Sequence, residues 1–323
     1  MKIMQENFNH KFARKTDHYE ITCHTQHNRL YKITLSKETI KSFLSDFSVY
    51  ETQNLEYVPY LRFNMAGRLQ ELLGESFTQD IQGILQDRQS GGFTISIQGQ
   101  SINTDDYVKF STAISHLIGI PNHDSMSGTF YARFSVKDTD NSDSYLRQAY
   151  RFFTLHTDGT FVDEPTDWLL MMKMEERNAV GGESRLLHLD DWDDFDYFRK
   201  HPLASHKFLY KASPSKNVPQ AIYRTTFYEH EREICICFID QFAYPETIEQ
   251  SLYLMNLSKS LESSPATKSL VLPIGEMIVI NNRFWMHGRA AFEKHPDLHR
   301  ELLRQRGTFA NERRKNLFIN YMQ

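Results

Sequence analysis

Two histidines and one aspartate are the residues of this chain with the clearest capacity for chemistry. His156 and Asp158 stand two residues apart in the segment Leu155-His156-Thr157-Asp158-Gly159. On an extended strand, side chains i and i+2 point to the same face, so these two side chains could hold one ligand together. Gly159 then permits a sharp turn of the backbone. A single His-x-Asp pair is weak evidence, because two such residues meet by chance in many chains.

A third candidate ligand, His287, lies far along the chain. It follows an apolar run at residues 276–280 that is typical of a buried strand. Two histidines and one carboxylate form the facial triad of non-haem iron(II) sites, which leaves three positions of a six-coordinate ion open for substrate and oxygen. The sequence therefore predicts an iron(II) centre held by His156, Asp158 and His287.

Other histidines are interpreted differently. His188 and Asp190 also form a His-x-Asp pair at the end of a predicted strand, but Asp190 opens an acidic run at 190–194. Clustered acidic side chains are favoured at a helix N-terminus, so we do not interpret this pair as metal ligands. His295 and His299 lie in a polar, proline-containing segment and are predicted to be exposed.

Composition narrows the class of protein. Of 323 residues, 40% are hydrophobic and 24% charged, as in ordinary globular proteins, and the 13% of aromatic residues suits a β-rich core. A net charge of −4 and a pI of about 6.4 indicate no broad cationic surface for nucleic acid or anionic lipid. The three cysteines, Cys23, Cys235 and Cys237, are too few and too unevenly spaced for a disulfide framework, and we interpret them as free thiols.

The chain also lacks membrane signals. No window approaches the ~18 consecutive apolar residues of a membrane span, and residues 1–15 have no apolar core of the kind that secretory signals carry. We therefore expect a soluble, cytoplasmic protein with no nucleic-acid or membrane partner.

The periodicity of the sequence predicts one domain, residues 29–323, behind a polar and irregular N-terminal arm at residues 1–28. Helical patterns fill a region at about 36–120, where Ser36 is expected to cap the first helix. From about 129 to 310 many short strands recur with little helix between them, which predicts a mixed, β-rich sandwich or barrel. The helices are expected at about 37–47, 61–86, 105–117 and 246–261.

The pattern of ligands resembles that of the iron(II)/2-oxoglutarate-dependent dioxygenases, in the branch related to taurine dioxygenase and γ-butyrobetaine hydroxylase. The Gly-Gly-Glu-Ser of residues 181–184 resembles the Gly-Gly-Asp-Thr that follows the first ligand pair there. Residues 275–282 resemble the strand and turn before the distal histidine, and residues 300–309 resemble the last strand. Within that superfamily the chain most resembles the glutarate hydroxylases, over most of residues 115–309.

This resemblance implies a double-stranded β-helix (jelly-roll) core with flanking N-terminal helices, and it implies Fe(II), 2-oxoglutarate and O2 as cofactor and co-substrates. The far carboxylate of 2-oxoglutarate needs a cation, and arginine binds carboxylate with two donors. Along a strand Arg304 and Arg306 share a face, and Arg300 also fits the spacing of the superfamily. We favour Arg306 for 2-oxoglutarate, with Ser184 donating a hydrogen bond to the same carboxylate, although the sequence does not order the three arginines.

The implied reaction converts glutarate, a small dicarboxylate, to L-2-hydroxyglutarate and releases succinate and CO2. Glutarate lacks the keto oxygen with which 2-oxoglutarate chelates the metal, and it needs a cation of its own, for which we choose Arg304. The alternative for an arginine pair on a strand is a buried salt bridge or a solvent-facing edge. The resemblance further implies a homotetramer that acts in lysine degradation.

Two other functions stay open at this point. The enzyme could hydroxylate another small acid, such as a betaine or a sulfonate. A jelly roll that has lost its chemistry and serves as a binding module is the second alternative, against which the complete set of three ligand types argues.

Overall fold

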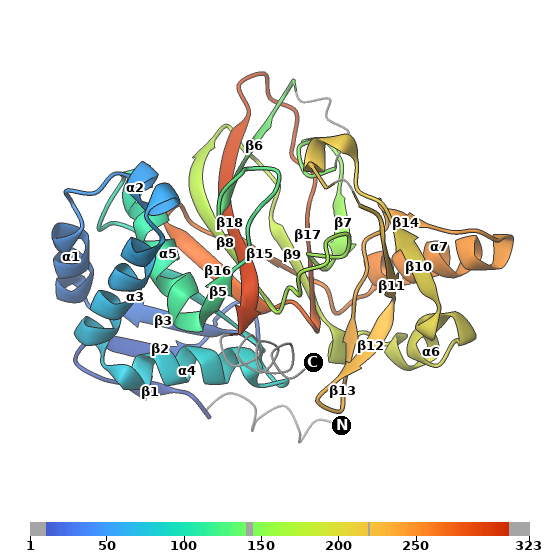
Figure 1. Cartoon of the computed structure of the whole chain (residues 1–323), viewed down its shortest axis with the longest axis horizontal. Coiled ribbons are helices and arrows are strands. Elements are labelled where there is room, and N and C mark those ends of the chain that lie inside the picture. The colour runs from blue at the N-terminus through green and yellow to red at the C-terminus, as the bar shows by residue number, and fades with distance from the viewer. Residues whose placement is uncertain (1–10, 140–144, 219, 310–323) are drawn as a thin grey trace, which may run out of the picture.

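The computed structural model describes residues 11–139, 145–218 and 220–309. Helices α1 to α5 and strands β1 to β3 gather on one side of the molecule, two larger sheets occupy the middle, and small sheets with α6 and α7 lie on the other side (Figure 1). Residues 1–10 of the predicted arm and residues 310–323 of the predicted domain lie outside the described residues.

The largest sheet has the strand order β1-β2-β3-β4-β16-β8-β18-β5, and β6 also pairs with β18. Its neighbouring strands are antiparallel except β3 and β4, which are parallel. The long strand β18, the last but one in this order, carries all three candidate arginines. The strands are β1 (Arg14–Lys15), β2 (Tyr19–Cys23), β3 (Tyr31–Leu35), β4 (Gly92–Ser96), β5 (Gly119–Pro121), β6 (Ala132–Lys137), β8 (Trp168–Arg177), β16 (Glu276–Asn281) and β18 (His299–Phe309).

A second, antiparallel sheet has the order β15-β9-β17-β7 and carries the candidate metal ligands. Apolar side chains of both sheets, such as Leu169 and Ile278 from the large one and Leu186 from the small one, belong to one buried cluster. Two antiparallel sheets packed face to face confirm the predicted mixed, β-rich fold with a jelly-roll core. The strands are β7 (Phe153–His156), β9 (Ser184–His188), β15 (Lys268–Leu270) and β17 (Trp285–Arg289).

The remaining strands form two small sheets, β11-β10-β14 and β12-β13, beside helix α7. Short 3-10 helices connect them to the core, and η3 precedes a residue in the left-handed region, Asn217. These elements are β10 (Lys207–Tyr210), β11 (Ile222–Thr225), β12 (Phe227–His230), β13 (Glu233–Ile236), β14 (Ala243–Tyr244), η1 (Leu189–Asp191), η2 (Pro202–Ser205), η3 (Pro214–Lys216), α6 (Phe195–Arg199) and α7 (Ile248–Ser263).

The N-terminal helices cover the outer face of the large sheet. A second buried cluster joins their apolar residues, among them Phe43 and Ile81, to sheet residues such as Met277 and Val279. Ser36 caps the first helix as predicted, since its side chain accepts a hydrogen bond from the Thr39 N–H. The helices are α1 (Lys37–Asp46), α2 (Thr52–Tyr57), α3 (Pro59–Leu73), α4 (Glu75–Gln86) and α5 (Thr104–Ile118).

Three local expectations are wrong. The helical pattern predicted at 61–86, with an irregularity near Ser76, is two helices, because Gly74 takes a φ of +86° between them. The predicted irregular arm contains β2, whose Tyr19 and Ile21 are buried although the surrounding residues are polar. No strand was predicted at residues 285–289, but the segment that carries His287 is strand β17, which follows β16 after a tight connection at Asn281 and Asn282.

None of the helices in the described part of the chain combines the length and apolarity that a bilayer crossing requires.

Candidate metal centre

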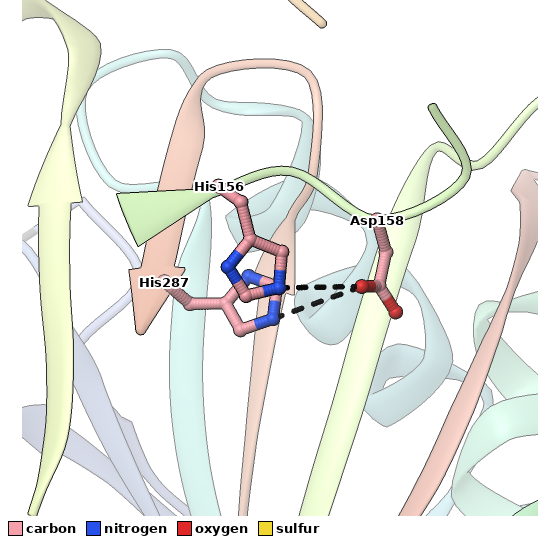
Figure 2. A group of neighbouring side chains, drawn as sticks. All are labelled: His156, Asp158 and His287. Atoms are coloured by element: carbon pink, nitrogen blue, oxygen red, sulfur yellow. Dashed lines mark ion pairs between the residues drawn. The ribbon is translucent and has the colours of Figure 1, made fainter. Parts of the chain in front are cut away.

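The three predicted ligands converge. Strands β7 and β17 are antiparallel neighbours in which His156 and His287 stand opposite each other, and their ring centroids are 4.2 Å apart. Asp158 follows β7, and its Oδ1 lies 3.7 Å from His156 Nε2 and 3.9 Å from His287 Nε2 (Figure 2). One donor atom from each residue lies within 4.8 Å of the others, so a single ion could contact all three.

The protonation states suit a cation. Burial lowers the pKa of His156, and burial together with the neighbouring His156 lowers the pKa of His287 to about 3. Burial alone would raise the pKa of Asp158, but Arg304 and other nearby cations hold it well below its usual range. His156 Nδ1 lies 2.7 Å from the Thr154 carbonyl, which assigns the proton to Nδ1 and leaves the Nε2 lone pair facing Asp158. Two neutral imidazoles and a carboxylate aimed at one point fit an iron(II) ion.

The backbone of Asp158 is held by Asn282. The Asn282 side chain accepts a hydrogen bond from the Asp158 N–H (2.8 Å) and donates to the Asp158 carbonyl (3.0 Å) and the Thr166 carbonyl (2.9 Å). Gly159 has a φ of +80°, and a β-carbon there would collide with the Thr166 side chain. Asn282 and Thr166 therefore hold the turn after His156 from both sides. Neither residue was assigned to this turn from the sequence.

Strand β7 is an edge strand, and a carboxylate of helix α7 closes its free edge. Glu262 accepts a hydrogen bond from the Leu155 N–H at 2.5 Å through one oxygen, and its other oxygen pairs with Arg185 of β9 at 2.6 Å. Leu155 precedes His156, so this contact orients the strand that carries the ligand. Sequence patterns gave no signal for it, because Glu262 lies 107 residues from Leu155.

Removing this carboxylate tests its role in positioning. Glu262→Ala is expected to weaken metal binding about tenfold, the lower end of the usual effect of partners that orient ligands. Anaerobic titration with Fe(II) measures this affinity. Glu249→Ala, at an exposed position of the same helix, is the matched control and should bind metal as the wild type does. Equal affinities for the three proteins would show that β7 holds its place without Glu262.

A cavity of about 60 Å³ adjoins the three ligands. Three of its polar lining residues were singled out by the sequence, and the structure brings them together with the ligands: Ser184, Arg300 and Arg304. Arg289, to which no role was assigned from the sequence, lines the cavity with them. Arg306, which the sequence favoured for 2-oxoglutarate, does not line it. It lines a second cavity of about 30 Å³ on the other side of Arg304.

Arg304 is held between two carboxylates. Its Nη1 lies 2.9 Å from Asp158 Oδ2, and its Nη2 lies 2.7 Å from Asp124 Oδ2. These ion pairs leave Oδ1 of Asp158 facing the two imidazoles. Arg304 therefore orients a candidate metal ligand, and Asp124 shares its charge, which no sequence motif indicated.

Arg300 and Arg289 lie deeper and form no ion pair among the described residues. Arg300 donates a hydrogen bond to the Gly182 carbonyl at 2.7 Å, and Arg289 donates to the carbonyls of Leu146 (2.6 Å) and Gln148 (2.7 Å). Burial lowers the pKa of Arg300 to about 10, and burial with the repulsion of Arg300 lowers that of Arg289 to about 9. Two buried cations without a counter-ion are costly unless an anion binds beside them.

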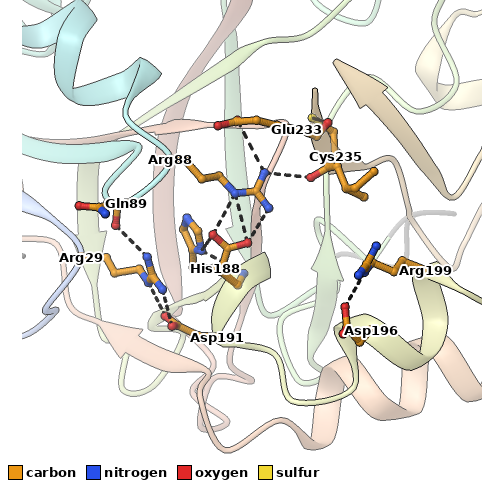
Figure 3. Close-up of polar contacts among 11 residues, drawn as sticks. Arg29, Arg88, Gln89, His188, Asp191, Asp196, Arg199, Glu233 and Cys235 are labelled. Carbon is orange, nitrogen blue, oxygen red and sulfur yellow. Dashed lines mark hydrogen bonds and ion pairs between the residues drawn. The ribbon is translucent and has the colours of Figure 1, made fainter. Parts of the chain in front are cut away.

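The second His-x-Asp pair serves the fold. His188 Nδ1 accepts a hydrogen bond from the Asp190 N–H and caps η1, while the Asp190 carboxylate pairs with Arg88 at 2.6 Å. Arg29 pairs with Asp191 beside it, so two arginines from the N-terminal region are tied to the jelly roll (Figure 3). These contacts give both residues of the pair a structural role.

His295 and His299 were both predicted to be exposed, and both are half-buried. His299 starts β18, where it lies near Glu175 and Glu301 with donor atoms close enough for one ion. Arg133 already donates two hydrogen bonds to Glu301, at 2.8 Å each, so this group is an ion-pair network across β6, β18 and β8.

The fold is shared with solved oxygenases. An asparagine oxygenase in complex with Fe(II), 3-hydroxyasparagine and succinate aligns over 86% of this chain and 93% of its own, with a TM-score of 0.69 and 13% identity. The non-heme iron oxygenase OrfP in complex with Fe and α-ketoglutaric acid aligns over 88% and 95%, with a TM-score of 0.65 and 15% identity. Identities this low show a common fold.

Sequence comparison is more specific. A glutarate 2-hydroxylase of Citrobacter koseri is 45% identical over 288 residues, which cover 88% of this chain and 89% of that protein. The CsiD family model matches residues 19–309, a range that contains the metal cluster, both cavities and all three arginines of β18. The chain is therefore a member of the CsiD family.

Proposed function

We propose that this protein is an iron(II)- and 2-oxoglutarate-dependent dioxygenase that hydroxylates glutarate to L-2-hydroxyglutarate and releases succinate and CO2. The observation that carries the proposal is the buried cluster of His156, Asp158 and His287 beside Arg289 and Arg300, which have no carboxylate partner among the described residues. Bound iron(II) would supply the activation of O2, one atom of which enters the substrate and the other succinate. The relationship to a glutarate 2-hydroxylase supports the choice of substrate.

Arg300 is our choice for the far carboxylate of 2-oxoglutarate, in place of Arg306. It lines the same cavity as the three metal ligands, it has no ion-pair partner among the described residues, and Ser184 lines the cavity with it. Arg289 adds positive charge to the same end. A carboxylate there would gain charge-assisted hydrogen bonds in a site that excludes water.

Arg306 is then the cation available to the substrate. It is buried, and it takes part in no ion pair within the described part of the chain. Arg304 lines both cavities, so it borders the substrate as well, but its charge is already shared by Asp124 and Asp158. Removing Arg304 would disturb a metal ligand together with the substrate, which makes Arg306 the cleaner position for a test.

Succinate release tests the function. Purified protein with Fe(II), O2 and 2-oxoglutarate is expected to form one succinate per glutarate hydroxylated, and to show little stimulation by betaines or sulfonates. Anaerobic addition of 2-oxoglutarate and then glutarate, followed through the metal-to-ligand absorption band, measures the two binding steps separately. A larger response to a betaine or sulfonate would change the substrate, and binding without any succinate would favour the inactive module.

We also propose that the enzyme works as a cytoplasmic homotetramer in lysine degradation. The resemblance to the glutarate hydroxylases supports this assembly and role. Light scattering after size-exclusion chromatography gives the mass of the assembly directly, and a mass of four 38.1 kDa chains is expected.

A further inference from the structure

A second small cavity lies beyond Arg304. It is lined by residues from four separate parts of the chain, and its volume of about 30 Å³ is enough to hold at least one water molecule. One wall is the segment after β10, where the short helix η3 ends at Lys216 and Asn217 turns into the left-handed region. The lining residues are Asp124, Ser125, Met126, Phe161, Lys216, Val218, Arg304 and Arg306.

Lys216 brings an ammonium group into this cavity without a carboxylate to balance it. Its Nζ lies 4.0 Å from the Met126 sulfur, a weak acceptor, and it forms no ion pair among the described residues. Burial, and after it the charge of Arg304, lowers the pKa of Lys216 to about 8. Asp158 and Asp124 act in the opposite direction, and Arg147 adds to the repulsion.

The charges around the cavity do not cancel. Three cations line it, Arg304, Arg306 and Lys216, and both nearby carboxylates, Asp124 and Asp158, are engaged by Arg304. Arg306 and Lys216 therefore face the same space with uncompensated charge. Arg306 is buried and Lys216 half-buried, and cations that are shielded from water in this way are stabilised when an anion binds between them.

We propose that Lys216 binds the substrate carboxylate that is remote from the hydroxylated carbon, and thereby selects dicarboxylates over monocarboxylates. The inference rests on the proposed function and names the residue that recognises the second acid group. Arg304 contacts a candidate metal ligand, so the substrate end beside Arg304 lies next to the reacting carbon. Lys216 and Arg306 lie across the second cavity, where the opposite end of a short dicarboxylate would arrive.

The test compares glutarate with its half-amide, in which one carboxylate is a neutral amide of nearly the same shape. Lys216→Met keeps the length of the side chain and removes its charge. It is expected to raise the Kd for glutarate, measured anaerobically with Fe(II) and 2-oxoglutarate bound, by about 30-fold or more, as for the loss of one partner of a buried charge pair. The Kd for the half-amide should change only a few-fold, and the affinity for 2-oxoglutarate should not change.

Two variants control for the fold and for general charge. Lys216→Arg keeps a cation at this position and should retain most of the preference for glutarate over the half-amide. Lys211→Met removes an exposed lysine five positions earlier on the same segment and should behave as the wild type does.

The outcomes separate the two proposals. A wild type that hydroxylates glutarate, combined with a Lys216→Met variant that keeps the full preference over the half-amide, would overturn the role of Lys216 alone. A wild type that prefers another dicarboxylate would overturn the choice of glutarate, and the same comparison with the half-amide of that acid would still decide the role of Lys216. A wild type that prefers the half-amide would overturn the selection of dicarboxylates.

Discussion

Asp158→Ala is expected to abolish the consumption of 2-oxoglutarate and to weaken Fe(II) binding by more than about 100-fold. Partners that merely orient ligands are worth about 10- to 100-fold in metal affinity, and Asp158 contributes the only carboxylate of the buried cluster. The variant also leaves Arg304 without the partner at 2.9 Å that helps to place it. Anaerobic metal titration and succinate release measure the two losses independently.

The control is the other His-x-Asp pair. Asp190→Ala removes the partner of Arg88 on a partly exposed surface, so it should cost about 1 kcal/mol of stability or less and leave metal affinity and turnover unchanged. Chemical denaturation measures the stability. If Asp190→Ala abolished metal binding and Asp158→Ala did not, the metal centre would lie at His188, and the oxygenase mechanism would have to be rebuilt around that residue.

The convergence of the ligands could be anticipated because much of it is local. His156 and Asp158 are linked by the two-residue period of an extended chain, which needs no tertiary information. The partnership with His287 was inferred from its place after an apolar run and from the ligand set of a facial triad, although the strand that carries it was not recognised. Strand β17 is buried along its whole length, and yet Gly288 and Arg289 interrupt its apolar pattern. Its polar groups serve the site, so the strand lacks the apolar run by which a buried strand is recognised.

The order of the arginines could not be anticipated. Arg300, Arg304 and Arg306 share one face of β18 by the same two-residue period, and the lining of the two cavities agrees with that. The position of the metal along β18 determines which arginine reaches which cavity. That position depends on the pairing of β18 with β8 and of β8 with β16. Alternation along one strand defines a face but gives no position along it.

The supporting residues were out of reach for another reason. Asn282, Glu262, Asp124 and Lys216 come from four segments that meet only in the folded protein. Each is a common polar residue to which no role was assigned from the sequence. Each of them serves a buried group that would otherwise lack a partner. Which groups are buried, and beside which residues, is decided only when the chain packs.

Arg300→Ala is expected to raise the Kd for 2-oxoglutarate by about 100-fold or more. The guanidinium is buried beside the metal ligands and has no ion-pair partner among the described residues, so its loss would leave the far carboxylate of 2-oxoglutarate desolvated and unpaired. Arg300→Lys should recover only part of the affinity, because an ammonium cannot donate two parallel hydrogen bonds. Anaerobic titration with 2-oxoglutarate in the presence of Fe(II) measures the effect.

Arg306→Ala is the matched variant six residues further along β18, on the same face, and it should reverse the pattern. It is expected to weaken glutarate binding strongly and 2-oxoglutarate binding only a few-fold, because Arg306 lines the cavity beyond Arg304. The opposite result, a large loss of 2-oxoglutarate affinity for Arg306→Ala and a small one for Arg300→Ala, would restore the assignment that the sequence favoured. It would also require 2-oxoglutarate to reach past Arg304, and the ion pairs of Arg304 with Asp124 and Asp158 would then have to open when the co-substrate binds.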